Sequence, residues 1–280
     1  MHKLDRLLIE PVVRAALLED VGHGGDLTTN AIVGADRRAS ARLVARKPGV
    51  VAGIDAATLV FTLLDPNTQV DIQIDDGERI AAGQTIGTVH SSAKALLTGE
   101  RTALNLLCHL SGISTQTRIL VDLIAGYPAH VVCTRKTNPG LRVLEKYAVR
   151  AGGGSNHRFG LDDAVLIKDN HLAVAGSIAS AVSAVRANVG HMVKVEIEVD
   201  TLEQLREALA QPIDAVLLDN MTPTELREAV DLVDGRVITE ASGTVTTERI
   251  VEIAQTGVDL ISVGWITHSA PALDIGLDFA

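Results

Sequence analysis

The spacing of apolar residues differs between an earlier and a later part of the chain. Between residues 40 and 89, apolar residues alternate with polar ones in three runs: Ala41, Leu43 and Ala45, then Val70, Ile72 and Ile74, then Ile86 and Val89. Turn signals rich in Gly, Asp and Pro separate these runs, which predicts half-exposed strands. Residues 56–64 predict a helix among them. This part is therefore predicted to be a small α+β unit, a scaffold or oligomer-forming domain.

Helical spacing flanks this unit on both sides. Residues 4–19 have apolar positions at helical spacing around Pro11, which is expected to open a second helix at its first turn. Residues 20–32, rich in Gly, Asp and Thr, predict a loop. Residues 93–125 predict two successive helices, and Gly112 is expected to end the first.

From residue 130 onward, strands and helices alternate. The apolar runs predict strands at 130–134, 164–169, 193–199, 214–219, 236–241 and 259–263, and helices at 177–188, 201–210, 223–233 and 246–256. Such alternation predicts parallel strands with right-handed connections. These strands are too few to close an eight-stranded barrel, so an incomplete barrel or an open sheet is expected.

Two domains are therefore expected. Residues 1–112 would form an N-terminal α+β open sandwich, and residues 113–270 an incomplete α/β barrel of parallel strands that carries the catalytic site. Residues 271–280 form a tail that could pack back on the first domain. Polar residues follow the predicted strands of the barrel: Lys168, Glu198, Asp219, Glu240 with Ser242, and Gly264. The carboxyl ends of parallel strands converge, so these residues are expected around one rim.

A basic segment, residues 133–171, leads into this rim. Its cations are Arg135, Lys136, Arg142, Lys146, Arg150, Arg158 and Lys168, in a chain of formal net charge -10. A run of three glycines, 152–154, precedes Asn156, His157 and Arg158 and permits backbone geometry that other residues resist. The concentration of positive charge predicts an anion-binding site, with a solvated basic face and a flexible loop as the alternative.

Composition narrows the class of protein. The 280 residues are 46% hydrophobic but only 2% aromatic, so the core is aliphatic and little side-chain surface is available for stacking on bases. Together with the acidic balance this argues against nucleic acid as a partner. No long apolar run predicts a membrane span, and the N-terminus lacks a signal peptide's apolar region, so a cytoplasmic location is expected. Cys108 and Cys133 are expected to be reduced and structural.

The acidic residues of the rim indicate a metal. Glu198 and Asp219 follow successive strands and offer oxygen ligands, and Mg²⁺ commonly uses one or two carboxylates together with substrate phosphates. The alternative is that they pair with Arg135 or Lys168 as structural ions. Gly243 and Gly264 end later strands, where such loops often hold phosphate. A phosphorylated sugar with an anionic co-substrate is the substrate class that results.

At this point the chain resembles the quinolinate phosphoribosyltransferases, the decarboxylating nicotinate-nucleotide pyrophosphorylases of NAD biosynthesis. The matching segments, in order between residues 98 and 269, are TGERTALNLLCHLSGIST, TRKTNPGLRVLEKYAVRAGGGSNHRFGL, LIKDNH, EIEVD, LLDN, EASG and VGWITHS. The resemblance implies an enzyme that transfers phosphoribosyl from phosphoribosyl pyrophosphate to quinolinate with decarboxylation. It gives nicotinate mononucleotide, pyrophosphate and carbon dioxide. The resemblance also implies Mg²⁺ as cofactor and a homodimer, or a higher oligomer.

The same resemblance assigns roles to individual residues. Quinolinate is expected to bind Arg135, Lys136, His157, Arg158 and Lys168, with Arg101 supplied across the dimer interface. Thr134 is also expected among the substrate-binding residues. Glu198 and Asp219 match the ribose and metal positions, and with Lys136 and Lys168 form the expected catalytic set. Ser242, Gly243 and Thr244, with Val263, Gly264 and Trp265, match the phosphate loops. The chain departs from the family pattern at Cys133, commonly Asp, and at Thr244, commonly Gly, which leaves the 5′-phosphate loop less certain.

Three other readings stay open. A paralogue on the same fold, associated with molybdate transport, would take a different substrate. A Schiff-base aldolase would use Lys168 as its nucleophile. A non-catalytic anion-binding protein would explain the cations, but it would not need Glu198 and Asp219.

Overall fold

The computed structural model describes residues 4–279 and divides into two compact units. Unit 1 contains the described residues up to Arg118, then Thr137–Gly153, and the residues from Ile266 onward. Unit 2 contains Ile119–Lys136 and Gly154–Trp265. This division differs from the expected single boundary after residue 112. Thr137–Gly153, from the middle of the basic segment, folds with unit 1.

Unit 1 is built on a four-stranded antiparallel sheet in the order β12-β1-β5-β3. Its strands are β1 (Arg38–Ala45), β3 (Gln69–Ile72), β5 (Thr85–Ser92) and β12 (Ile275–Phe279), which the chain's C-terminal segment adds beside β1. Two short strands, β2 (Gly49–Val50) and β4 (Arg79–Ile80), form a separate ribbon. The alternating runs seen in the sequence are these strands, and the predicted α+β architecture is confirmed.

The helices of unit 1 correct two expectations. They are α1 (Arg6–Val21), α2 (Leu27–Ile32), α3 (Ile54–Leu64), the first part of α4 (Ala93–Leu123), and α5 (Arg142–Ala151). The prediction that Pro11 opens a new helix is wrong, because Ile9 and Val13 are buried on either side of it and α1 runs through. The prediction of a loop at 20–32 is wrong at its end. Asp26 caps α2 there by accepting from Thr29 N at 2.9 Å.

Helix α4 is one helix of 31 residues, so the prediction that Gly112 ends a helix is wrong. Gly112 serves a different purpose. A Cβ added there would lie 2.2 Å from the carbonyl oxygen of Pro271, so the missing side chain lets the returning chain pass close to the helix. The buried stripe continues through Leu110, Ile113 and Leu120, which keeps the helix regular across this point.

Unit 2 is an open parallel sheet of six strands, in the order β6-β11-β10-β9-β8-β7. They are β6 (His130–Val132), β7 (Val165–Ile167), β8 (Val195–Val199), β9 (Ala215–Asp219), β10 (Ile238–Ser242) and β11 (Leu260–Ser262). All six predicted strands are confirmed. The edges β6 and β7 do not pair with each other among the described residues, so the barrel is incomplete, as expected.

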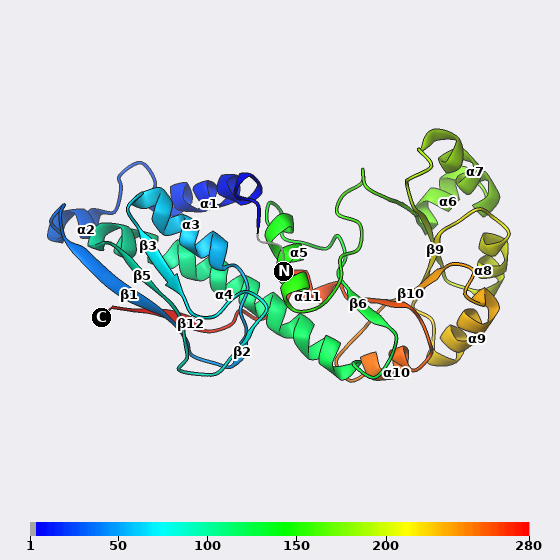
Figure 1. The fold of residues 1–280 in the computed structure, drawn as a ribbon. Helices are drawn as coiled ribbons and strands as arrows, with labels where there is room; N and C mark the ends of the chain where they lie inside the picture. Colours follow the sequence, from blue (N-terminus) through cyan, green and yellow to red (C-terminus); the bar gives the residue numbers. More distant parts are fainter. Residues whose placement is uncertain (1–3, 280) are drawn as a thin grey trace. The chain divides into compact units, whose positions relative to one another are not determined.

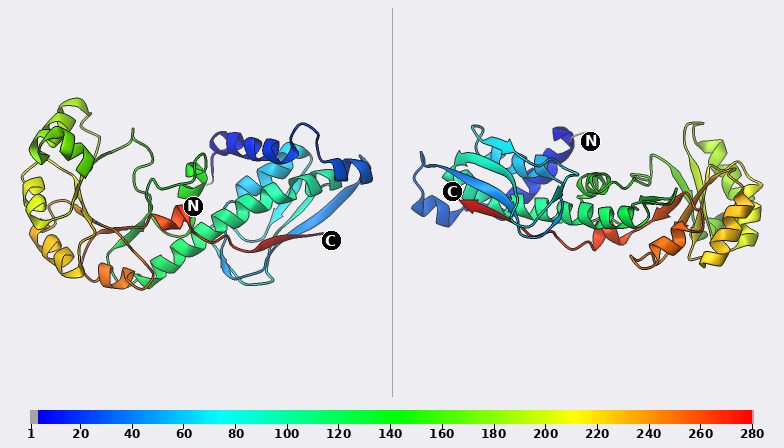
Figure 2. Two further views of the ribbon diagram at one scale, coloured as in Figure 1. Left: turned by 180° about the vertical axis from the view of Figure 1, so that it is seen from behind. Right: turned by 60° about the horizontal axis from the view of Figure 1, so that its bottom comes forward.

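Helices α7 (Ile178–Asn188), α8 (Leu202–Leu209), α9 (Pro223–Val233) and α10 (Ile250–Ala254) follow one another around the outer face of the curved sheet (Figures 1 and 2). Two short helices, α6 (Asp169–Ala175) and α11 (Trp265–His268), were not predicted. Parallel register sets Ser242 beside Asp219, and Glu198 beside Leu217. The carboxyl ends of β8, β9 and β10 therefore come to one edge of the sheet.

Among residues 4–279, no helix combines the length and hydropathy that a membrane span requires. Cys108 and Cys133 are both free thiols. Cys133 is buried directly after β6, and its Sγ lies 3.3 Å from Asn156 Oδ1.

Candidate active site

A pocket of about 420 Å³ opens at the carboxyl ends of the strands of unit 2. Its lining residues are Thr134, Arg135, Lys136, His157, Arg158, Leu166, Lys168, Glu198, Leu217, Asp219, Glu240, Ser242 and Ser262. Ten of the residues named from the sequence therefore lie around one cavity. Arg101 is exposed on α4 in unit 1 and is not among them.

Cations crowd one side of the pocket. Burial, and then the charge of Arg135, lower the pKa of Arg158, so the two guanidinium groups are close enough to oppose each other's charge. Arg158 Nη1 donates to the carbonyl oxygen of Ala164 at 3.0 Å, which orients the side chain. Arg135 Nε is buried without a hydrogen-bond partner among the described residues. A site that holds two close guanidinium groups in this way is suited to an anion with more than one negative charge.

Contacts between neighbouring residues hold Thr134 and Lys136 in place on this cationic side. Thr134 Oγ1 accepts a hydrogen bond from Lys136 N at 3.0 Å, which turns the chain as it leaves β6. A Cβ added at Gly264 would lie 3.0 Å from Lys136 Cδ and 3.5 Å from Thr134 Oγ1. Gly264 therefore leaves room for the Lys136 side chain beside β11. Beyond Lys136 the chain enters unit 1, where the fully buried Glu145 accepts from Asn138 N at 3.0 Å.

The acidic side of the pocket contains an ion pair. Lys168 Nζ lies 2.5 Å from Glu198 Oε2, and the Glu198 side chain is 14% exposed. Asp219 Oδ2 accepts from Asn220 Nδ2 at 2.6 Å. The pairing of a rim carboxylate with Lys168, raised as an alternative from the sequence, is therefore present at Glu198. Both carboxylates line the pocket, and their oxygen atoms are of the kind that Mg²⁺ prefers as ligands.

The sequence placed Glu240 on the rim without giving it a role, and it gave no role to Glu196. His157 Nε2 lies 2.8 Å from Glu196 Oε2 and 3.7 Å from Glu240 Oε2. These three residues form a set of possible metal-ligand atoms that all lie within 4.8 Å of one another. Burial first, and then the charge of Glu196, raise the pKa of Glu240 to about 7, while His157 and Ser262 oppose the rise. The signal available in the sequence was a Glu inside each of two buried strands.

Unusual backbone conformations mark the loops after β9 and β10. Asn220 has φ 54°, Gly243 has φ 101° and Thr244 has φ 45°, all in the region that favours glycine. Asn220 N donates to the carbonyl oxygen of Ser242 at 2.9 Å, and a Cβ at Gly243 would meet Asn220 Oδ1 at 2.1 Å. The two loops are thus packed against each other. Thr244 occupies a conformation that suits the Gly expected there, so the chain carries local strain at this point.

The other predicted phosphate-loop residues follow β11. Val263 is buried and donates from its backbone N to the carbonyl oxygen of Val132 at 2.9 Å. Trp265 Nε1 donates to the carbonyl oxygen of Val245 at 2.9 Å. Trp265 thereby ties the start of α11 to the loop that follows Thr244. These contacts are structural, and they keep two glycine-containing loops at the same edge of the sheet.

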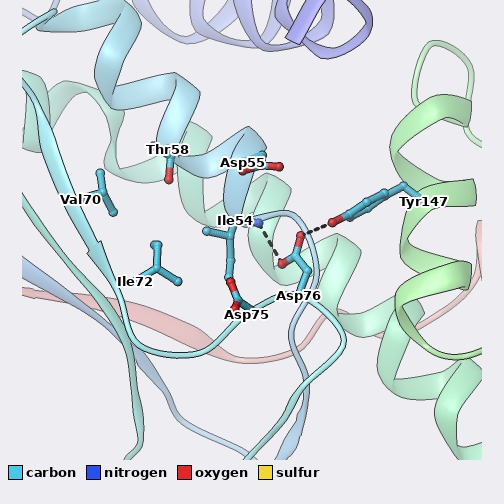
Figure 3. A pocket seen from close by; sticks show the side chains of 8 residues that line it. All are labelled: Ile54, Asp55, Thr58, Val70, Ile72, Asp75, Asp76 and Tyr147. Atoms are coloured by element: carbon cyan, nitrogen blue, oxygen red, sulfur yellow. Dashed lines mark hydrogen bonds between the residues drawn. The ribbon is translucent and has the colours of Figure 1, made fainter. Parts of the chain in front are cut away.

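A second pocket, of about 360 Å³, lies entirely within unit 1 and is lined by acidic rather than basic side chains. Asp55, Asp75 and Asp76 line it beside Tyr147 of α5 (Figure 3). Burial raises the pKa of Asp76, although its carboxylate accepts from Tyr147 Oη at 2.7 Å and from Gly53 N at 3.0 Å. None of the residues predicted from the sequence for substrate or metal lies here. Its contacts join α5 to the start of α3.

Known proteins resemble this chain over nearly its whole length. Family models described as the N-terminal and C-terminal domains of quinolinate phosphoribosyl transferase match residues 26–111 and 113–278. The probable nicotinate-nucleotide pyrophosphorylase [carboxylating] of Bacillus subtilis is 45% identical over 275 residues, covering 98% of this chain and 94% of that protein. The corresponding enzyme of Mycobacterium leprae is 48% identical over 274 residues, with 95% of each chain covered.

Solved structures extend the likeness to the fold. The nicotinate-nucleotide pyrophosphorylase of Francisella tularensis superposes with a TM-score of 0.94 at 40% identity, covering 99% of this chain and 98% of that one. Both units are therefore matched over nearly their whole length. With two family models that together span most of the sequence and relatives well above 40% identity, the chain belongs to the quinolinate phosphoribosyltransferase family.

Proposed function

We propose that the protein transfers the phosphoribosyl group of phosphoribosyl pyrophosphate to quinolinate, with loss of carbon dioxide, to give nicotinate mononucleotide for NAD biosynthesis. The observation that carries the proposal is the pocket at the strand ends of unit 2. Arg135, Lys136, Arg158 and Lys168 line it together with two carboxylates suited to a metal. Family membership supports the same reaction.

The cationic side would hold the pyridine dicarboxylate. A guanidinium group presents parallel donors that match a carboxylate, whereas a lysine ammonium supplies a compact point charge. Arg135 and Arg158 are the two guanidinium groups of the pocket, and their mutual opposition is relieved when an anion binds between them. Lys136 adds positive charge at the more exposed end of the same side.

The acidic side would hold the metal-bound co-substrate. Glu198 and Asp219 would coordinate Mg²⁺, and Ser242, Gly243 and Thr244 would donate to the 5′-phosphate of the ribose. When bound, Mg²⁺ neutralises charge that develops on the pyrophosphate leaving group. Lys168, paired with Glu198, lines the same pocket and could contact either anion.

The chemistry requires orientation and charge more than a protein nucleophile. As pyrophosphate leaves, positive charge develops at the anomeric carbon, and the carboxylates of Glu198 and Asp219 are suited to stabilise it. Arg135 and Arg158 would hold the pyridine ring so that its nitrogen can attack that carbon. N-ribosylation turns the ring into an electron sink, so the 2-carboxylate can leave as carbon dioxide.

The aldolase reading loses support. A Schiff-base lysine must present an unprotonated amine to its substrate. The Nζ atom of Lys168 is already engaged by Glu198 Oε2 at 2.5 Å. Trapping with borohydride is therefore expected to leave Lys168 unmodified.

We further propose a homodimer in which Arg101 of each chain reaches the pocket of the other. The support is its exposure on α4 and the match of its surroundings, TGERTALN, to the family's quinolinate-binding arginine. A cytoplasmic location is also proposed. Two free thiols and no disulfide among the described residues are in keeping with a reducing compartment.

The direct test is incubation with quinolinate, phosphoribosyl pyrophosphate and Mg²⁺. Nicotinate mononucleotide should form, and quinolinate labelled at the 2-carboxylate should release labelled carbon dioxide in equal amount. Omission of phosphoribosyl pyrophosphate is the control for spontaneous decarboxylation. Absence of both products from a folded preparation would exclude the proposed activity.

A further inference from the structure

Glu240 is a buried acid that lines the active-site pocket, and one of its carboxyl oxygens makes no hydrogen bond to residues 4–279. Its side chain is 1% exposed, yet it lines the cavity together with the substrate-binding cations. Oε1 of Glu240 has no hydrogen-bond partner among residues 4–279. A buried polar atom without a partner is costly, and native proteins retain such atoms mainly where a ligand or a catalytic function requires them. Its position in the cavity indicates that the partner is the substrate.

The neighbours of Glu240 disfavour its ionised form. Glu196, from β8, takes the close contact with His157 Nε2 at 2.8 Å, whereas Glu240 Oε2 is 3.7 Å from the same atom. His157 Nε2 is thus the closer partner of Glu196, whose charge also interacts with Arg158. On the other sides, Leu217 of β9 and Leu260 of β11 are its register partners, and the hydroxyl of Ser262 is the other polar group nearby. The pKa of Glu240 is accordingly raised to about 7, first by burial and then by Glu196.

A metal ion is a poor explanation for this cluster. Glu196, Glu240 and His157 are acceptable ligand types for a divalent cation. However, the charge of Glu196 already acts on the neighbouring Arg158 guanidinium, which would repel a second cation held at this cluster. A proton on Glu240 relieves the repulsion between the two carboxylates without adding a second positive ion.

We propose that Glu240 is a specificity-determining residue of this site, which as a neutral carboxylic acid donates a hydrogen bond from its unpartnered oxygen to an oxygen of the anionic substrate. This role rests on the proposed function and deepens it. A protonated carboxyl group is a donor, whereas a carboxylate can only accept. A hydrogen bond from a hydroxyl to a carboxylate is among the strongest neutral-to-charged contacts. Ionised Glu240 would instead place a buried negative charge against an incoming dianion.

The proposal predicts how quinolinate binding depends on pH. The KM for quinolinate should be constant below pH 7 and rise by up to about tenfold per pH unit above it, since only the protonated form of Glu240 donates. The KM for phosphoribosyl pyrophosphate should not follow this profile. Both carboxyl groups of a pyridine dicarboxylate are already ionised in this range, so the substrate itself does not contribute.

Initial rates of the full-length enzyme between pH 6 and 9 provide the test. Glu240→Gln keeps a donor that does not titrate, so its quinolinate KM should lie close to the wild-type value at pH 6 and stay flat to pH 9. Glu240→Asp keeps a titrating acid one methylene further back, so it should bind more weakly at pH 6 and retain a pH dependence. Glu252→Gln, an exposed glutamate of α10, is the matched control and should reproduce the wild-type profile.

Each result is decisive. A flat wild-type profile, or a Glu240→Gln profile that still rises like the wild type, overturns the role of Glu240 while leaving the proposed activity intact. A wild-type enzyme that does not turn over quinolinate at any pH overturns the proposed function and this inference with it. Circular dichroism establishes that each variant is folded, and if Glu240→Gln is not, the wild-type and Glu240→Asp profiles still separate the outcomes.

Discussion

Lys168 Nζ lies 2.5 Å from Glu198 Oε2, so an ion pair already joins the ends of β7 and β8. Asp219, at the end of the next strand, instead accepts from the neutral amide of Asn220 and keeps its charge for another cation. The two carboxylates proposed for Mg²⁺ are therefore unequal. Among residues 4–279, Glu198 has an ion-pair partner and Asp219 has none.

Removal of this charge should abolish metal-dependent turnover. Asp219→Ala is expected to lower activity by about a hundredfold or more at wild-type Mg²⁺ concentrations. Chelation of Mg²⁺ should abolish wild-type activity, and added Mg²⁺ should restore it. Asp200→Asn, at an exposed carboxylate just after β8, is the matched control. Full turnover of the wild type in excess chelator would contradict the metal assignment.

Nicotinate should be a poor substrate. Arg135 and Arg158 oppose each other in the pocket, and a monocarboxylate would offset less of this opposition than a dicarboxylate. The lost charge-assisted contacts are each worth a few kcal/mol, so kcat/KM for nicotinate should be at least about a hundredfold below that for quinolinate. Both acids are assayed at the same concentration of phosphoribosyl pyrophosphate. Comparable turnover of the two would assign the protein to a different acceptor.

The protonation of Glu240 should also appear in folding stability. Its folded pKa of about 7 lies above the ordinary value of 4.5, so the native state binds the proton more tightly than the unfolded chain. The resulting stabilisation is fully present below pH 4.5 and is lost as the pH rises through 7. Relative to Glu240→Gln, the wild type should therefore lose about 1–3 kcal/mol of unfolding free energy between pH 5 and pH 8.

Urea unfolding of both proteins at the two pH values measures this difference. Other titrating groups are common to the two chains and cancel in the comparison. Glu252→Gln should run parallel to the wild type. A Glu240→Gln variant that also runs parallel would mean that Glu240 is already ionised at pH 5.

The sequence was sufficient for the strands and for most of the pocket. The βα alternation places Glu198, Asp219 and Ser242 at strand ends, and parallel strands bring such ends together. The floor of the pocket was not predictable in this way. His157, from a loop, lies 2.8 Å from Glu196 and 3.7 Å from Glu240, and no local pattern in the sequence encodes these distances.

The structural role of a glycine is a second feature that the sequence alone does not predict. A glycine that ends a helix and a glycine that lets another segment pass close by look the same in a sequence, because both signals consist of a missing Cβ. Gly112 was read as a helix end, but it lies inside α4 against Pro271, which is far away along the chain. Only the path of the returning C-terminal segment distinguishes the two cases.

Gly112→Ala should therefore destabilise unit 1 even though alanine favours helices. The added methyl group would lie 2.2 Å from the carbonyl oxygen of Pro271, so α4 or the C-terminal segment must shift. Overpacking of this kind costs about 1–3 kcal/mol. Gly126→Ala is the control, since a Cβ there meets nothing within 4 Å. Equal urea midpoints for the two variants would show that the segment around Pro271 yields freely.

The last prediction concerns the proposed exchange of Arg101 between chains. Arg101 is exposed on α4 in unit 1, whereas Lys136 lines the pocket in unit 2. If each pocket takes Arg101 from the partner, Arg101→Ala and Lys136→Ala should each be inactive as homodimers but should complement when mixed. In a mixed dimer, one pocket receives both intact residues and the other receives neither.

Random exchange makes about half of the dimers mixed, each with one working pocket, so the pool should recover about a quarter of wild-type activity. Exchange is verified with mass-tagged subunits, and mixing either variant with itself is the control that should recover nothing. If Arg101 acted within its own chain, each pocket of a mixed dimer would lack one residue, and activity would stay absent despite exchange. One outcome gives about a quarter of wild-type activity and the other gives none, so an ordinary rate assay distinguishes them.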